Sequence, residues 1–296
     1  MLPLFDLHCD TFSELYKTKQ KFEKNSLHIS LEKSSCFSPY VQICAIWSDY
    51  RYSDDTAFSQ CLNNITYLKE QGFAICTKLS ANRNNTFILS IEDARLLNGD
   101  LSRLDTLYNL GVRALTLNWK DKSCIGGGWN TNYSLSFFGK AVVKRASELG
   151  IIIDLSHSSP QVFYEALDLC KNYQKTPIAS HSNSYSVCNH KRNLSDNQFI
   201  ELSKISSLVG ISLSPEHLGG TGICDIMKHI YHYLALGGER NVCLGCDFDG
   251  ITSLPDGFKS IADLKLLYTS LEKEFGEQIA QNIFYNNAYS YFSKKL

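Results

Sequence analysis

Eight short apolar runs recur along the chain, and they constrain the fold more than any other feature of the sequence. They are rich in β-branched and aromatic residues and lie at 2–7, 41–47, 87–91, 112–117, 151–155, 177–179, 208–213 and 242–245. Several of them are apolar at nearly every position, as is typical of parallel strands buried on both faces. We therefore predict eight buried strands.

Helical patterns lie between most of these runs. The sequence predicts helices at 57–71, 101–110, 139–149, 197–205 and 226–236, with a closing helix at 277–296. The first three end directly before a glycine (Gly72, Gly111 and Gly150), which is the residue that most readily adopts the left-handed conformation at a helix C-terminus. Ser159 and Pro160 predict the start of another helix, with a serine cap followed by a proline in the first turn.

Strands that alternate with helices over about 250 residues are the pattern of a (β/α)8 TIM barrel. A doubly wound open sheet is the competing architecture. Its nucleotide-binding version is disfavoured because no glycine-rich phosphate turn follows the first run. No proline- or glycine-rich linker interrupts the 296 residues, and we predict a single barrel domain over residues 1–296.

Composition excludes several classes of function. The formal net charge of −1 gives no overall field that would recruit nucleic acid or an anionic membrane. No apolar run approaches the roughly 18 residues that a membrane span needs, and the N-terminus lacks a signal-peptide pattern. Eleven cysteines, an odd number in a large chain, indicate free thiols in a reducing compartment. We expect a cytoplasmic protein that binds neither nucleic acid nor membranes.

Metal-binding side chains follow five of the predicted strands. They are His8 and Asp10, Glu92, His157, His181, and Asp247 with Asp249. In a barrel, the carboxyl ends of the strands meet at one rim, and imidazole and carboxylate groups together suit a divalent metal of the zinc type. A single strand-end histidine is more often structural, but this convergence predicts a site for two metals.

Two divalent ions about 3.5–4 Å apart can share a bridging carboxylate and a bridging water. They lower the pKa of that water and polarise a carbonyl group, while a further carboxylate carries the proton to the leaving amine. The residues themselves therefore predict a dinuclear metal hydrolase that acts on an amide-like bond.

With these residues in place, the chain resembles the membrane (renal) dipeptidase family of zinc peptidases. The resemblance runs from Phe5 to about Phe292, and its specific motifs are Asp-Leu-His-Cys-Asp (6–10), Leu-Gly-Val-Arg-Ala-Leu-Thr-Leu (110–117), Ile-Asp-Leu-Ser-His (153–157), Ala-Ser-His-Ser-Asn (179–183), Lys-Arg-Asn-Leu-Ser-Asp (191–196) and Gly-Cys-Asp-Phe-Asp-Gly (245–250). The resemblance implies a (β/α)8 barrel that uses two Zn²⁺ ions, or other divalent metals, to hydrolyse dipeptides.

The resemblance also implies a role for each site residue. His8 and Asp10 would bind one zinc, His157 and His181 the other, and Glu92 would bridge both. Arg192 matches the arginine that holds the carboxylate of the substrate, and Asn193 follows it in the same motif. Asp247 matches the aspartate near the bridging water that accepts and donates the proton.

The chain departs from the usual family pattern at three positions. Leu7 replaces a glycine in the first motif, and Asp93 follows Glu92 where glycine is common. Trp119 occupies the place of a substrate-contacting histidine after the fourth strand. Because an indole donates one hydrogen bond and cannot become cationic, Trp119 changes how that part of the substrate site works.

The sequence thus predicts a zinc dipeptidase that attacks the peptide through a dizinc-bridged hydroxide. Two alternatives stay open: another metal-dependent amide or lactone hydrolase on the same barrel, and a member that binds metal or peptide without turnover. A homodimer is expected by resemblance only.

Overall fold

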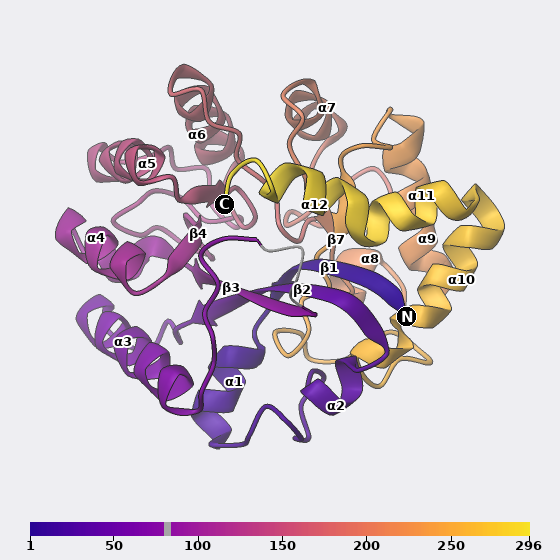
Figure 1. Cartoon of the computed structure of the whole chain (residues 1–296). Coiled ribbons are helices and arrows are strands. Elements are labelled where there is room, and N and C mark those ends of the chain that lie inside the picture. Colours follow the sequence, from indigo (N-terminus) through magenta and orange to yellow (C-terminus); the bar gives the residue numbers. More distant parts are fainter. Residues whose placement is uncertain (80–83) are drawn as a thin grey trace. The chain divides into compact units, whose positions relative to one another are not determined.

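The computed structural model describes residues 1–79 and 84–296 (Figure 1). Its strands are β1 (Leu2–Cys9), β2 (Phe37–Trp47), β3 (Asn85–Glu92), β4 (Val112–Thr116), β5 (Ile152–Asp154), β6 (Val209–Ile211) and β7 (Val242–Leu244). Its α-helices are α1 (Thr11–Thr18), α2 (Leu31–Ser34), α3 (Asp54–Glu70), α4 (Leu101–Asn109), α5 (Phe137–Leu149), α6 (Pro160–Asn172), α7 (Asp196–Lys204), α8 (Pro215–Leu218), α9 (Ile223–Ala235), α10 (Leu264–Phe275), α11 (Glu277–Gln281) and α12 (Asn287–Phe292).

The chain divides into two compact units. Unit 1 comprises Met1–Cys44, Lys78–Phe87 and Ser180–Leu296, and unit 2 comprises Ala45–Thr77 and Ile88–Ala179. Among the residues that the structure describes, no helix is both long and apolar enough to cross a membrane. All eleven cysteines are free thiols, as their number predicts.

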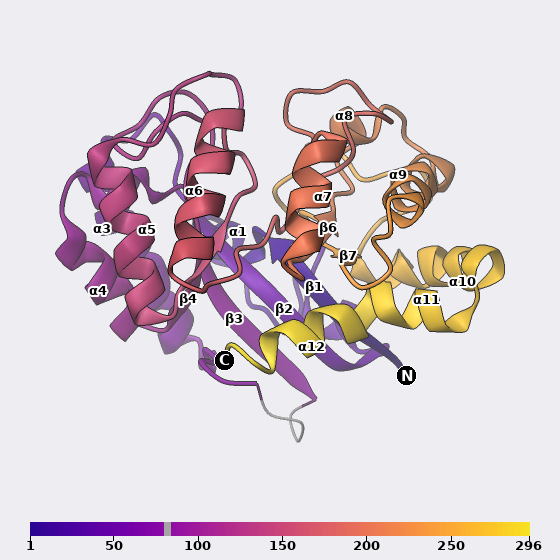
Figure 2. The same ribbon diagram turned by 90° about the horizontal axis from the view of Figure 1, so that it is seen from above.

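Unit 1 is built on parallel pairing in the order β2-β1-β7-β6. Its closing segment, which runs through α11, a π-helical turn at Asn282–Asn286 and α12, packs on β1 and β7 (Figure 2). Phe292 meets Phe5 of β1 with 5.0 Å between ring centroids, and both side chains are fully buried. The predicted single helix at 277–296 is present as α11, the π-helical turn and α12, which together end at Phe292.

Unit 2 carries the parallel order β5-β4-β3, flanked by helices in which α4 packs on α5 and α5 on α6 (Figure 1). The N-caps of α3, α4, α5 and α6 each accept a backbone N–H through the side chain, and they are Ser53, Asp100, Ser136 and Ser159. Such caps accept hydrogen bonds from first-turn N–H groups that have no partner within the helix. Each cap typically stabilises the protein by about 1 kcal/mol. The predicted Ser159–Pro160 start is confirmed.

Seven of the eight predicted strands are present, and the prediction at 177–179 is wrong. Ile178 forms an isolated bridge there: its N–H donates to Ile153 O at 2.9 Å, and Leu155 N–H donates to Ile178 O at 2.8 Å. Ala179 is a bridge residue as well, but Pro177 has no N–H to extend the ladder. The segment therefore has bridge pairing without a strand, and the chain goes on to His181.

The glycines expected at helix C-termini have the predicted conformation. Gly72, Gly111 and Gly150 have φ values of 79°, 111° and 79°. At these values a side chain would be strained, so the three residues end their helices by backbone freedom. The structure also has helices α1, α2, α8 and α10, which are not among the helices predicted from the sequence. Helices α2 and α8 have only four residues each, whereas α10 has a regular apolar stripe of Leu264, Leu267, Tyr268 and Leu271.

Beyond the end of β6, the side chain of Asn183 continues the sheet pairing. Its Oδ1 accepts from Ser212 N at 2.9 Å, and its Nδ2 donates to Ser212 O at 3.0 Å, with the residue fully buried.

We expect Asn183→Ala to lower the free energy of unfolding by about 2–3 kcal/mol because both backbone groups lose their partner. Chemical denaturation measures this, and the exposed Asn63→Ala in α3 should change stability by less than about 0.5 kcal/mol. Equal effects of the two variants would contradict the pairing role.

Candidate metal centre

Three side chains meet at the carboxyl ends of β1 and β7 in unit 1. His8 Nε2 lies 3.4 Å from Asp10 Oδ2 and 3.8 Å from Asp247 Oδ1, and all three residues are buried. His8 and Asp10 meet because alternate residues of an extended chain face the same side. Asp247 joins them because β7 pairs with β1 and its backbone N–H donates to His8 O at 3.1 Å.

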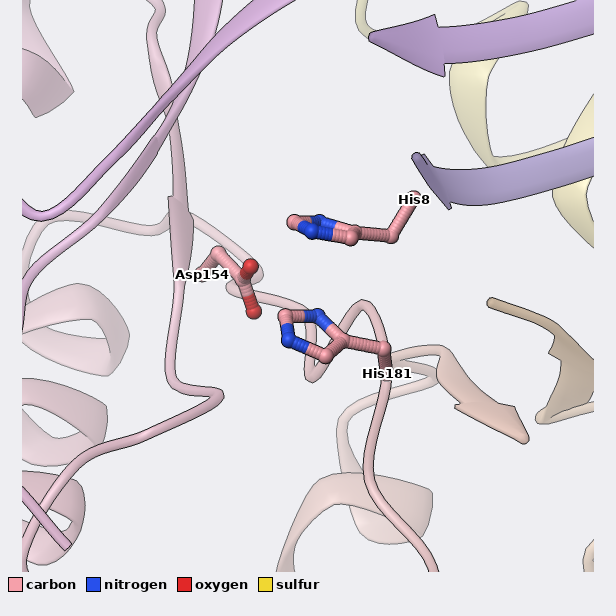
Figure 3. Close-up of side chains that lie close together, drawn as sticks. All are labelled: His8, Asp154 and His181. Carbon is pink, nitrogen blue, oxygen red and sulfur yellow. The ribbon is translucent and has the colours of Figure 1, made fainter. Parts of the chain in front are cut away.

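The imidazole of His181 belongs to the same group in unit 1. Its ring stacks on that of His8 with 3.8 Å between centroids and an interplanar angle of 27°, which Figure 3 shows from the side. The ligand nitrogens of the two rings lie within 4.8 Å of one another. Ser180 Oγ is 2.7 Å from His181 Nδ1 and fixes the orientation of the ring. Two imidazoles and two carboxylates are thus gathered within one unit.

Unit 2 holds a second group of donors. Glu92, the last residue of β3, approaches His157 with 3.0 Å between Oε1 and Nε2, and both residues are buried. Asp154 ends β5, and its carboxylate accepts from Thr116 Oγ1 at 2.8 Å and from Ser156 N at 3.0 Å. Sequence reasoning missed Asp154, which Figure 3 also draws. Its one signal was its place in Ile-Asp-Leu-Ser-His, a charged residue within an apolar run.

Backbone strain is concentrated at these residues. His157, Asp247, Asp249 and Asp93 have φ values of 64°, 63°, 66° and 81°, a region that residues other than glycine rarely adopt. Such conformations cost about 1–3 kcal/mol each and are held by the surrounding structure, most often at functional sites. The carboxylate of Asp249 accepts from Thr11 Oγ1 at 2.6 Å and from the backbone N–H of His28 at 2.6 Å, and these contacts hold its side chain.

The unit 1 group has the properties of a cation site. Asp10 Oδ1 is buried and has no hydrogen-bond partner within the described residues. Gly250 packs so closely that an added Cβ would clash with Asp10 Oδ2 and Asp247 Oδ1. Buried carboxylates are costly without a compensating charge. Because imidazole and carboxylate donors surround them, a divalent metal of the zinc type fits these residues.

Arg192 is buried and reaches back to the metal-binding segment of unit 1. Its Nη1 donates to Ser182 Oγ at 2.9 Å and its Nη2 to His181 O at 2.8 Å. Arg192 is 4% exposed and is therefore not a solvated loop charge. Asn193 donates through Nδ2 to Cys188 O at 2.9 Å and His217 O at 2.8 Å, and thereby holds the loop that carries Arg192.

Two histidines near this loop are kept neutral. Burial, with Arg192 nearby, lowers the pKa of His217 to about 3. Burial likewise lowers the pKa of His229 to about 4, and its Nδ1 accepts from Ser184 N at 3.0 Å. His229 lies on helix α9 and its side chain is fully buried. Arg192 is therefore the buried positive charge of this loop, which suits an anionic group.

Comparison with known proteins assigns the chain to a protein family. A family model described as Membrane dipeptidase (Peptidase family M19) matches residues 1–294. An uncharacterized dipeptidase of Schizosaccharomyces pombe is 31% identical over 193 residues, which are 62% of this chain and 46% of the yeast protein. A second S. pombe dipeptidase is 29% identical over 227 residues, 72% of this chain and 50% of its own length. The chain thus spans about half the length of these curated relatives.

Solved structures share the fold. One is a dipeptidase described as a metallopeptidase of family M19, with a TM-score of 0.90 and 22% identity over 99% of this chain and 98% of its own. Another is a metallopeptidase from Rhodobacter sphaeroides liganded with a phosphinate mimic of the dipeptide L-Ala-D-Ala. Its TM-score is 0.89, with 21% identity over 100% of this chain and 99% of its own. The predicted α/β fold of the TIM-barrel type is confirmed.

The contact of Gly250 with two carboxylates allows a direct test of the unit 1 cation site. We expect Gly250→Ala to lose most of the bound metal, because the added methyl group must displace Asp10 or Asp247. Metal content per chain after dialysis, measured by atomic emission, checks this. Gly222→Ala is the matched control, since its Cβ would meet nothing closer than 3.6 Å, and it should retain the wild-type metal content. Full metal content in Gly250→Ala would contradict the assignment.

Proposed function

Because the chain belongs to the membrane dipeptidase family, peptidase family M19, we propose that it is a zinc-dependent dipeptidase that releases free amino acids from dipeptides. The observation that carries this proposal is the stacked pair of His8 and His181 beside the carboxylates of Asp10 and Asp247. The relative solved with a mimic of L-Ala-D-Ala supports a dipeptide as the substrate class.

We propose two zinc ions, as the family resemblance implies. His8 and Asp10 would hold one ion and His157 and His181 the other, with Glu92 as a ligand common to both. The buried Oδ1 of Asp10 and the close pair of Glu92 and His157 support this set. When bound, the metal ions supply Lewis acidity toward the peptide carbonyl and an activated water.

Side chains of the protein bind the substrate and transfer the proton. Arg192 binds the carboxylate of the dipeptide, because its guanidinium is fixed by Ser182 and by the backbone of His181 and offers paired donors to a planar anion. Asp247 moves the proton to the leaving amine, for which its place beside His8 is suited. Trp119 and Asn193 complete the substrate side of the site.

We further propose that residues 1–296 act as one catalytic domain in the cytoplasm. Eleven free cysteines support a reducing compartment. The homodimer stays a prediction.

The first experiment combines metal counting with turnover. Purified protein is assayed on L,L- and L,D-dipeptides, a lactone and a cyclic amide, first as isolated, then after chelation and after zinc is restored. We expect dipeptide cleavage that disappears with the metal and returns with about two zinc ions per chain. Cleavage of the lactone or cyclic amide alone would replace the dipeptidase with another amide or lactone hydrolase. Bound zinc and dipeptide without any product would make the chain a binding protein.

Two substitutions separate carboxylate binding from proton transfer. Arg192→Ala should raise KM at least tenfold with a smaller change in kcat, because it removes binding common to substrate and transition state. Asp247→Asn should lower kcat at least a hundredfold, since an amide cannot carry the proton. Steady-state kinetics on one dipeptide, with thermal unfolding of each variant, measures both. An unchanged KM in Arg192→Ala would remove the carboxylate assignment, and full activity of Asp247→Asn would remove Asp247 from the mechanism.

A further inference from the structure

Three aromatic rings form a cluster in unit 2, which we call the aromatic platform: Trp47, Tyr50 and Trp119. Trp119 follows β4 and meets Trp47, the last residue of β2, edge to face at 5.2 Å between ring centroids. Tyr50 stacks on Trp119 at 5.7 Å with an interplanar angle of 22°. The platform brings together segments about 70 residues apart in the chain, and such contacts favour a defined ring geometry.

The platform keeps accessible surface. Tyr50 is 55% exposed, and the side chains of Trp47 and Trp119 are half-buried. The ammonium of Lys120 lies 4.1 Å from the ring centroid of Tyr50 and 5.0 Å from that of Trp119. Exposed aromatic rings offer apolar area to a ligand, and the ammonium disfavours a second cation on the same rings.

The platform adjoins the metal donors of unit 2. The ring centroid of Trp119 is 6.3 Å from that of His157, and His157 Nε2 is 3.0 Å from Glu92 Oε1. A group that packs against Trp119 would therefore lie next to His157, one of the residues proposed to hold the metal.

The loop that carries Tyr50 is held in place by Arg95. This buried guanidinium donates to Ser48 O at 3.2 Å, Asp49 O at 2.9 Å and Tyr52 O at 3.1 Å, and its Nε lies 3.3 Å from Asp93 Oδ2. Asp93 follows Glu92 directly. The loop is thus tied to the residue beside a metal donor, which positions the platform before any ligand binds.

We propose that the aromatic platform is the subsite for a large apolar or aromatic side chain on the amino-terminal residue of the dipeptide. This inference rests on the proposed dipeptidase function. Arg192 is assigned to the carboxylate of the second residue, so the first residue is the one left to place beside the carbonyl held at the metal. Flat rings bury an apolar side chain well, and Lys120 selects against a lysine or arginine at that position.

The test compares L-Phe-Gly with L-Ala-Gly and L-Lys-Gly on the zinc-loaded protein. We expect kcat/KM to be at least tenfold higher for L-Phe-Gly than for either of the others. Trp119→Ala should reduce the ratio of L-Phe-Gly to L-Ala-Gly about tenfold, while Trp119→Phe should restore most of it. Phe137→Ala, which removes a 96% exposed ring at the start of α5, is the matched control and should leave the ratio unchanged.

A binding measurement accompanies the kinetics. Phosphinate analogues of L-Phe-Gly and L-Ala-Gly are titrated calorimetrically into the wild type and Trp119→Ala, and the ratio of their Kd values should fall in the same way as the kinetic ratio. Cleavage of both dipeptides with the same ratio in the wild type and Trp119→Ala would overturn the inference and leave the dipeptidase standing. A preference for L-Lys-Gly would overturn it as well. Absence of cleavage of every dipeptide would overturn the proposed function, and the inference with it.

Discussion

Carboxylates buried at the ends of parallel strands are the constraint on which the rest of this molecule depends. In unit 1, Asp10 and Asp247 lie against His8, and Gly250 leaves no room for even a methyl group beside them. Such charges are tolerated in a protein interior only with a compensating cation or a dense set of donors. The stacked histidines and the left-handed backbone of Asp247 follow from this requirement, because both place donor atoms where ordinary packing would not.

The same constraint explains why the proposed ligands stand out in the sequence. Buried parallel strands are recognised by their apolar runs, and although one histidine after such a run is more often structural, histidines and carboxylates after several runs indicate a shared site. The spacing of His8 and Asp10 predicts that they share a face, and they do meet. Local sequence patterns likewise predict seven of the eight strands, the Ser159 cap and the glycines at helix ends. The run at 177–179 failed because a three-residue segment that begins with proline cannot sustain a ladder.

Other features depend on tertiary contacts and have at most a weak local signal. Arg192 belongs to a polar loop in sequence, yet its two hydrogen bonds to Ser182 and His181 bury it. His229 lies on the apolar stripe of α9 with Ile226, Ile230 and Tyr233, but its hydrogen bonds with Ser184 N and Leu218 O come from other parts of the chain. Asp154 reads as part of an apolar strand until its hydrogen bonds with Thr116 and Ser156 are known. The conformations of His157 and Asp247 are likewise held by neighbours distant in the chain.

In the proposed site, Trp119 stands where the family resemblance implies a histidine, and this difference changes the kind of selectivity that we propose. A histidine at this place could ionise and donate from two nitrogens, whereas an indole donates once and offers a large apolar face. Here that face is joined by Tyr50 and Trp47, and Arg95 ties their loop to the residue after Glu92. Trp119 is thus part of a local set of aromatic contacts. In the proposed function, Arg192 and the metal donors recognise charge, while the aromatic platform next to His157 recognises the shape of an apolar side chain.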